Sequence, residues 1–240
     1  MQQNQQFQLP PEEELSILMS GDWTGEMADR LSTAWFNTMS LTQKLPPEIR
    51  YMPGMSGRKY RSLINLLMET TPDARYLEIG SWAGSTACSA IWGNTATATC
   101  IDNWSEFGGP KDAFHANVKY CLTDDIKFNF IESDFRKVDY TTIGQFNVYM
   151  FDGPHSEQDQ YDGVAIAQPA LDNDYYLIVD DWNSVQVREG TERAIKDLNL
   201  TVHARMDIFS NQNNNHPVIC KESSDWHNGY LIAVVSKAGS

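Results

Sequence analysis

The sequence predicts an α/β protein built on one doubly wound sheet of seven strands, mostly parallel, with helices on both faces and an antiparallel last strand. Three observations predict this fold. Short apolar runs alternate with stretches of helical periodicity, several runs end at a glycine or an acidic residue, and the last two are joined by the polar segment 210–229, which has no helical pattern. Parallel neighbours need a crossover, whereas antiparallel neighbours need only a loop, so the final pair is expected to be antiparallel.

The expected elements alternate along most of the chain. Strands are expected at 75–79, 97–101, 127–131, 146–151, 175–180, 202–209 and 230–235. Helices are expected at 58–69, 84–92, 111–121, 157–170 and 186–198. The helices between parallel strands then form right-handed crossovers.

The first 57 residues are expected to form a separate N-terminal part. Residues 1–14 are rich in glutamine, proline and glutamate, and are predicted to be a disordered tail. From residue 15 to about residue 45 the apolar spacing is roughly helical, and proline-containing segments interrupt it before residue 57. We therefore expect a helical cap at 15–57, followed by the main domain at 58–240.

The composition indicates a globular protein with an acidic surface. Hydrophobic residues make up 41% of the 240 residues, enough for a sizeable core. With 32 acidic and 18 basic residues the net charge is −14 at pH 7, so a nucleic-acid partner is not expected. The sequence shows no signal-peptide pattern and no long apolar run, so we expect a cytoplasmic location and no membrane partner. The four cysteines lack the spacing of a disulfide framework or a zinc site.

A glycine-rich turn, residues 78–84 (Glu-Ile-Gly-Ser-Trp-Ala-Gly), follows the first strand of the main domain. Glycine permits a tight turn and a close approach to a ligand. The G-x-x-x-G spacing differs from the G-x-G-x-x-G that holds a pyrophosphate, which disfavours a nicotinamide oxidoreductase. Glu78 would repel a pyrophosphate but accept hydrogen bonds from an ammonium group. Alone, the turn is equally consistent with a strand-to-helix connection that binds nothing.

Polar residues also follow the second and third strands of the main domain. Asp102 ends the second, where an acidic residue can bind both ribose hydroxyls of an adenosine. Asn103 and Trp104 come next, and the indole would either stack on a purine or pack in the core. Ser133 and Asp134 follow the third strand and are candidate partners for the adenine amine. Open α/β sheets bind ligands at this edge, so these residues predict an adenosine site.

The fourth and fifth strands end in aspartates. Asp152 follows one strand, and Asp180 and Asp181 follow the other. On neighbouring strands the three carboxylates would converge and repel one another unless a cation lies between them, and an all-oxygen set suits Mg²⁺. Each aspartate alone is better explained as a helix cap, and only the three together favour a metal. Beside a metal, His155 becomes a candidate general base.

The order of these residues resembles that of class I S-adenosylmethionine-dependent methyltransferases, over roughly residues 55–236. The resemblance implies a Rossmann-like fold with S-adenosylmethionine as cofactor. It further implies a set of residues around that cofactor, namely Met55, Glu78, Gly80, Ser81, Gly84, Ser85, Thr86, Asp102, Asn103, Trp104, Ser133, Asp134 and Asp152.

Within that class, the later residues resemble the metal-dependent O-methyltransferases of the macrolide-sugar and catechol types. The resemblance implies Mg²⁺ on Asp152, Asp180 and Asp181, His155 as the base, and a small-molecule hydroxyl acceptor such as a sugar or diol. The sugar enzymes tend to have Glu-Asp, and the catechol enzymes Asp-Asn, where this chain has two aspartates. A metal-independent methyltransferase and a catalytically inactive cofactor-binding protein stay open as alternatives, as does a homo-oligomeric state.

The sequence also leaves two interpretations for the aromatic residues near the predicted site. Trp182, Trp226 and Tyr230 either line it or pack in the core. None of the other histidines lies in a pattern comparable to that of His155. Both the segment 210–229 and the N-terminal cap are candidate lids, because loops over such sites exclude water.

Overall fold

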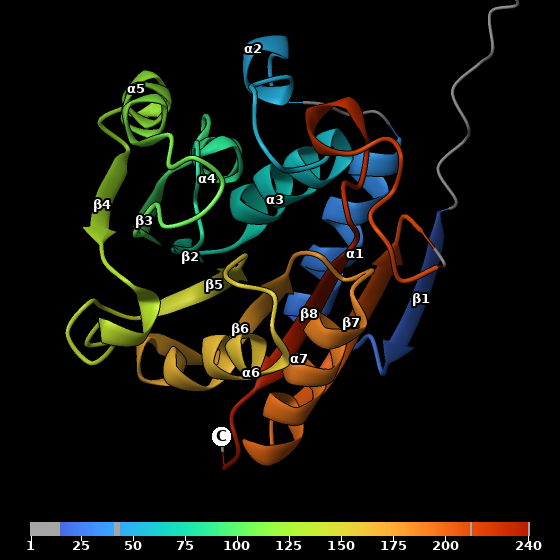
Figure 1. Ribbon diagram of the computed structural model, residues 1–240. Helices are drawn as coiled ribbons and strands as arrows, with labels where there is room; N and C mark the ends of the chain where they lie inside the picture. The colour runs from blue at the N-terminus through green and yellow to red at the C-terminus, as the bar shows by residue number, and fades with distance from the viewer. Residues whose placement is uncertain (1–14, 41–43, 212, 240) are drawn as a thin grey trace, which may run out of the picture.

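The computed structural model describes residues 15–40, 44–211 and 213–239, so the predicted tail at 1–14 lies outside the described residues. The strands are β1 (Ser16–Gly21), β2 (Arg75–Ile79), β3 (Ala96–Asp102), β4 (Ile126–Glu132), β5 (Phe146–Phe151), β6 (Leu171–Val179), β7 (Thr201–Phe209) and β8 (Tyr230–Ser236). The helices are α1 (Glu26–Met39), α2 (Pro47–Arg50), α3 (Arg58–Thr70), α4 (Ser85–Ile91), α5 (Lys111–Cys121), α6 (Glu157–Ile166) and α7 (Val185–Asp197). The strands form one sheet in the order β1-β7-β8-β6-β5-β2-β3-β4 (Figure 1).

Five neighbouring strands, β4, β3, β2, β5 and β6, run parallel, as predicted. Their ends are level, because Ile79 of β2 pairs with Ile101 of β3 and with Phe151 of β5, and Phe151 pairs with Val179 of β6. The backbone ladder continues one residue further, since the Asp152 N–H donates to the Ile79 carbonyl at 2.9 Å. The residues that follow these strands therefore meet at one edge of the sheet.

The antiparallel part of the sheet is larger than predicted. β8 pairs antiparallel with both β6 and β7, which confirms the predicted final pair. The described sheet nevertheless has eight strands, not seven, because β1 pairs antiparallel with β7. The helical prediction was wrong at β1: the apolar spacing there looked helical, but Leu18 and Met19 are exposed, and the backbone hydrogen bonds go to β7 instead. The predicted cap is helical at α1 and α2, and its boundary at residue 57 stays a prediction.

Helices cover both faces of the sheet (Figure 1), and an apolar core lies on each face. One is formed with α1, α3, α4 and α5, and the other with α6 and α7. Trp182, Trp226 and Tyr230 are fully buried in these cores, and the Tyr230 side chain also forms a hydrogen bond with Asp180. Within the described residues, no helix is long and apolar enough to span a bilayer.

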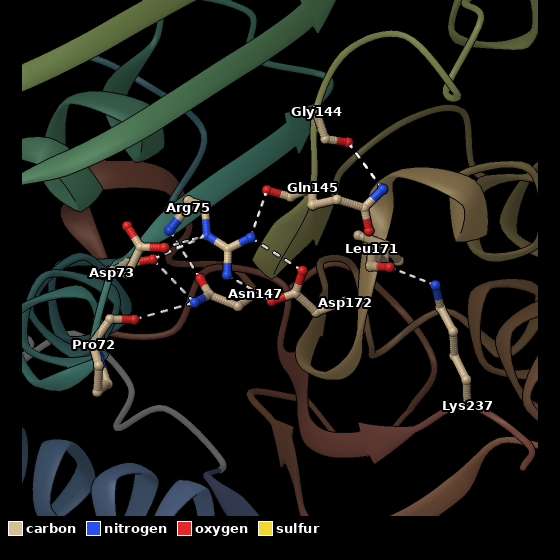
Figure 2. Close-up of polar contacts among 9 residues, drawn as sticks. All are labelled: Pro72, Asp73, Arg75, Gly144, Gln145, Asn147, Leu171, Asp172 and Lys237. Atoms are coloured by element: carbon tan, nitrogen blue, oxygen red, sulfur yellow. Dashed lines mark hydrogen bonds and ion pairs between the residues drawn. The ribbon is translucent and has the colours of Figure 1, made fainter. Parts of the chain in front are cut away.

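The amino ends of the parallel strands are tied together by polar side chains (Figure 2). The Arg75 guanidinium donates to both carboxylate oxygens of Asp172, at 3.1 and 2.7 Å, and joins β2 to β6. The Asn147 side chain accepts from the Arg75 N–H at 2.8 Å and donates to the Asp73 carbonyl at 3.1 Å, which joins β5 to β2. Arg75 and Asp172 are therefore paired at this end of the sheet.

Candidate functional site

A cavity of about 460 Å³ opens at the opposite end, where the parallel strands finish. Its size falls in the range of small-molecule sites, roughly 300–1,000 Å³. The cavity brings together ten of the residues predicted from the sequence: Met55, Gly80, Asp102, Asn103, Ser133, Asp134, Asp152, His155, Asp180 and Asp181. Their binding roles stay predictions, but their proximity is a property of the fold.

Six predicted residues do not line this cavity: Glu78, Ser81, Gly84, Ser85, Thr86 and Trp104. The Trp104 ring packs against Phe130, with 4.8 Å between ring centroids, and its Nε1 donates to the Trp82 carbonyl at 3.2 Å. The tryptophan that lines the cavity is Trp82, which the sequence-based prediction passed over. Its position inside the glycine-rich turn was the available signal.

Glycine is required at position 80 by the protein's own backbone. Gly80 has a φ of 87°, and a Cβ there would lie 1.8 Å from the Asp152 carbonyl oxygen. The ends of β2 and β5 therefore approach so closely that no side chain fits between them. This close approach places Asp152 beside the glycine-rich turn, whether or not a ligand is bound.

The carboxylate of Asp102, the last residue of β3, is held in a defined orientation. Asp102 Oδ2 accepts the Trp82 N–H at 2.7 Å, and Oδ1 accepts the Trp104 N–H at 2.6 Å. Each carboxylate oxygen keeps a further lone pair, so Asp102 can still accept hydrogen bonds from two ligand hydroxyls. The two tryptophans thus orient the acid predicted to bind the ribose.

Three aspartates lie close together after β5 and β6, of which Asp180 and Asp181 are buried and Asp152 is partly buried. Burial raises the pKa of Asp152, and the negative charges of Asp180 and Asp181 raise it further. Burial and the charge of Asp181 likewise raise the pKa of Asp180. This concentration of negative charge is unfavourable in the protein alone and favourable around a cation. Carboxylate oxygens are the ligands that Mg²⁺ prefers. Among the described residues, the groups whose ligand atoms lie within 4.8 Å of one another are Asp152, His155 and Asp181, and Asp181, His216 and His227.

His155 lies against this cluster. Its Nε2 is 2.6 Å from Asp181 Oδ2, and that hydrogen bond raises the pKa of His155. Burial alone would raise the pKa of Asp181, but the hydrogen bond and charge of His155, together with the Asn228 amide, lower it to about 2. The structure therefore couples the predicted base directly to a predicted metal ligand.

Two further histidines reach the cavity from the segment 210–229, contrary to the expectation that His155 stands alone. His216 Nε2 lies 3.9 Å from Asp181 Oδ1, and the ring of His227 is 5.2 Å from that of His216. His227 Nδ1 accepts the Lys221 N–H at 2.9 Å, and burial lowers the pKa of His227 to about 4. Asp181, His216 and His227 have ligand atoms within 4.8 Å of one another and form a group that could hold a metal ion.

The same segment forms one wall of the cavity. His216, Lys221 and His227 line it from this segment, whereas within the described part of the predicted cap only Met55 does. Of the two candidate lids, 210–229 therefore contributes more of the lining. Nothing in the sequence marked these residues, since the contact depends on how the loop between β7 and β8 folds back over the sheet.

Backbone strain is concentrated around this cavity. Ten described residues other than glycine have a positive φ, and five of them line it: Trp82, Phe107, Asp181, Lys221 and His227. Such conformations each cost about 1–3 kcal/mol and persist where the surrounding structure enforces them. Their concentration at one cavity supports its identification as the functional site.

The fold with this edge-of-sheet cavity is the Rossmann-like fold that S-adenosylmethionine-dependent methyltransferases share. The O-methyltransferase TomG from Streptomyces achromogenes, involved in tomaymycin synthesis and solved with S-adenosylmethionine, matches with a TM-score of 0.57 and 13% identity. The match covers 89% of this chain and 100% of that one. At this identity the likeness shows the fold alone.

Other solved structures match in the same way. The methyltransferase PaMTH1 from Podospora anserina, solved with S-adenosylhomocysteine, has a TM-score of 0.52 and 16% identity, over 87% of this chain and 88% of that one. A Pyrococcus horikoshii protein described as a candidate RNA methyltransferase has a TM-score of 0.52 and 13% identity, over 87% and 98%. Neither a protein-family model nor a curated protein sequence matches the chain.

Proposed function

We propose that the protein is an S-adenosylmethionine-dependent O-methyltransferase that acts on a hydroxyl of a small molecule, with Mg²⁺ held by Asp152, Asp180 and Asp181. The observation that carries the proposal is the convergence of these three carboxylates with His155 on the cavity. The fold supports the choice of cofactor, since structures that share it hold S-adenosylmethionine or S-adenosylhomocysteine.

The cofactor would lie across the ends of β2, β3 and β4. Asp102 would accept hydrogen bonds from the ribose hydroxyls, as its orientation by two backbone N–H groups allows. Ser133 and Asp134 would meet the adenine amine, and Trp82 offers the aromatic surface beside it. The sulfonium end would then point toward Asp152, the neighbour of Gly80.

The acidic half of the cavity would carry the chemistry. A divalent cation at the three aspartates would supply a Lewis acid that lowers the pKa of a nearby hydroxyl. Neutral His155 would take the hydroxyl proton on Nδ1, because its Nε2–H donates to Asp181, which would orient the imidazole and stabilise the imidazolium that forms. The oxygen would attack the methyl carbon as its bond to sulfur breaks, which yields a methyl ether and S-adenosylhomocysteine.

The charge of the cavity supports a small acceptor over a nucleic acid. Its lining has six carboxylates (Asp102, Glu106, Asp134, Asp152, Asp180 and Asp181) but only two permanent cations, Arg136 and Lys221. Arg136 is paired in turn with Asp159. A phosphate backbone would be repelled by this surface and by the net charge of −14.

Calorimetric titration with S-adenosylmethionine, with and without Mg²⁺, tests the proposal. We expect the wild type to bind the cofactor and Mg²⁺, and Asp152→Ala to lose the metal. Asp172→Asn, at the other end of the sheet, is the matched control and should behave like the wild type. Absence of cofactor binding would contradict the proposal, and cofactor binding and methyl transfer that ignore Mg²⁺ would favour a metal-independent methyltransferase.

A further inference from the structure

Two histidines of the segment 210–229 and the second aspartate after β6 form a compact group at the cavity. His216 Nε2 lies 3.9 Å from Asp181 Oδ1, and one ligand atom from each of Asp181, His216 and His227 lies within 4.8 Å of the others. All three residues line the cavity. Asp181 and His227 are buried, whereas 56% of the His216 side chain is exposed. The group therefore has two enclosed members and one that can move toward them.

The donor atoms of this group differ from those of the three aspartates. Two imidazole nitrogens and one carboxylate oxygen suit borderline divalent cations such as Zn²⁺ and Co²⁺, whereas an all-oxygen set suits Mg²⁺. Zinc–ligand bonds are about 2.0–2.2 Å long, so two ligand atoms of a tetrahedral ion lie roughly 3.4 Å apart. The 3.9 Å between His216 and Asp181 is close to that spacing, and a small movement of the exposed His216 side chain closes the difference.

Asp181 can belong to this group and also to the proposed Mg²⁺ site. Its Oδ2 is 2.6 Å from His155 Nε2, while its Oδ1 faces His216 and accepts a hydrogen bond from Asn228 Nδ2. Oδ1 keeps a second lone pair beside that hydrogen bond. The two carboxylate oxygens have different neighbours, so each can serve a different cation, as in two-metal sites.

One hydrogen has to move before His227 can bind a cation. His227 Nδ1 accepts the Lys221 N–H at 2.9 Å, so the neutral ring carries its hydrogen on Nε2. When Nε2 binds the cation, that hydrogen moves to Nδ1 and the Lys221 N–H turns to water. Lys221 is exposed, and its φ of 58° lies in the left-handed region, which side chains rarely adopt. The exchange is therefore confined to this turn and releases no net proton.

A cation at this group would hold the middle of the segment, whose ends are already fixed. The Asn183 amide donates to Ser210 Oγ at 3.0 Å and to Asn228 Oδ1 at 3.1 Å. His216 lies between these two anchors in the sequence, and its contact with Asp181 is too long for a hydrogen bond. Coordination would replace that loose contact with metal–ligand bonds.

We propose that Asp181, His216 and His227 form a second metal site, which takes Zn²⁺ or a similar borderline cation and fastens the segment 210–229 over the cavity. Three protein ligands leave a fourth tetrahedral position, which is open to water or to a ligand oxygen in the cavity that all three residues line. The inference goes beyond the proposed function, and the two metal sites share only Asp181.

Calorimetry with Zn²⁺ in saturating Mg²⁺, which competes for the carboxylates, tests the site. The wild type should bind Zn²⁺. His216→Gln should bind it at least about 10- to 100-fold more weakly, since the loss of even a partner of a metal ligand has an effect of that size. Co²⁺ in place of Zn²⁺ should give the strong visible absorption of a four-coordinate ion in the wild type, and His216→Gln should lose it. The affinity for Mg²⁺ should be the same in both proteins.

Tryptic cleavage after Lys221 measures whether the cation fastens the segment. Zn²⁺ at about 100 times its Kd should slow cleavage of the wild type by up to about 100-fold, because only the metal-free form opens. His216→Gln should be cleaved at the same rate with and without Zn²⁺. Equal rates with and without Zn²⁺ in the wild type would show that the cation does not hold the segment.

His115→Gln is the matched control, because His115 is also exposed but does not line the cavity. It should bind Zn²⁺ and resist trypsin as the wild type does. Equal Zn²⁺ affinity in the wild type and His216→Gln, or no Zn²⁺ binding at all, would overturn the site. Zn²⁺ binding that Asp152→Asn removes and His216→Gln does not would place the ion at the three aspartates and overturn it as well. Absence of Mg²⁺ binding would instead contradict the proposed function.

Discussion

Strand β6 has an aspartate at its amino end and another directly after its carboxyl end, and the two lie in opposite surroundings. Asp172 receives two hydrogen bonds from Arg75, which pair its charge (Figure 2). Asp180 lies beside Asp152 and Asp181, and burial together with the charge of Asp181 raises its pKa. The same strand thus has a stabilising acid at one end and a destabilising acid at the other.

The difference shows where the fold tolerates unfavourable charge. At the amino ends the side chains satisfy one another, so their role is to hold the strands together. At the carboxyl ends the acids repel, the backbone is strained at Asp181, and buried polar groups such as Glu78 Oε1 are unsatisfied. Such features persist at sites where a ligand completes them. The predictions below follow from this contrast.

Replacement of the base should have the largest effect. His155→Gln is expected to reduce methyl transfer by about 10²- to 10⁴-fold, the usual contribution of a general base. The affinity for S-adenosylhomocysteine should be unchanged. Release of S-adenosylhomocysteine in the presence of a panel of sugars and diols measures the rate. His203→Gln is the control, since His203 pairs with Ser236 away from the cavity, and equal rates in wild type and His155→Gln would exclude His155 as the base.

Replacement of Asp180 should remove most of the stabilisation by Mg²⁺ and should stabilise the metal-free protein. Mg²⁺ at about 100 times its Kd should stabilise the wild type by about 2.7 kcal/mol, and Asp180→Asn should lose most of that gain. Without divalent ions Asp180→Asn should instead unfold at a higher temperature than the wild type, because one buried negative charge is gone. Thermal unfolding with and without Mg²⁺ measures both, and a variant that Mg²⁺ stabilises as much as the wild type would argue against the metal site.

The stability of the ligand-free protein should depend on pH through Glu78. Burial raises the pKa of Glu78 from its ordinary value of 4.5 to about 7. The folded state then holds the proton more tightly than the unfolded state, so this contribution is fully present below about pH 4.5 and is lost as the pH rises through 7.

Glu78→Gln removes that dependence. Relative to the wild type, its unfolding free energy should rise with pH by up to about 1.4 kcal/mol per unit between pH 5 and 7. Denaturant unfolding at several pH values measures the difference. Glu26→Gln, at an exposed position on α1, is the control. A difference that stays constant from pH 5 to 8 would contradict the raised pKa.

The opposite end of β6 should give the smallest effect. Asp172→Asn is expected to lower the unfolding free energy by about 1 kcal/mol, because it breaks a paired but partly exposed contact with Arg75. Binding of S-adenosylhomocysteine and Mg²⁺ should stay at the wild-type level. A variant that loses either ligand would show that the two ends of the sheet are not separate in function.

Most of the parallel sheet was predictable from sequence, because each strand and its following helix are marked by local periodicity. The ends of those strands coincide in space, so Gly80, Asp102, Asp152 and Asp180 could be placed at one edge without coordinates. The eighth strand was not predictable in this way. β1 is held by hydrogen bonds to β7, far away in the sequence, and its own apolar spacing resembles a helix.

The sequence by itself therefore determined the parallel strands and the acids that follow them, since these depend on local pattern. It also determined that the carboxyl ends of these strands lie at one edge of the sheet, because parallel pairing requires it. Only the tertiary structure decided that Trp82 faces the cavity instead of Trp104, that His227 joins it, and that Arg61 is fully buried. Those properties depend on backbone conformation and on contacts between distant segments, which no local pattern records.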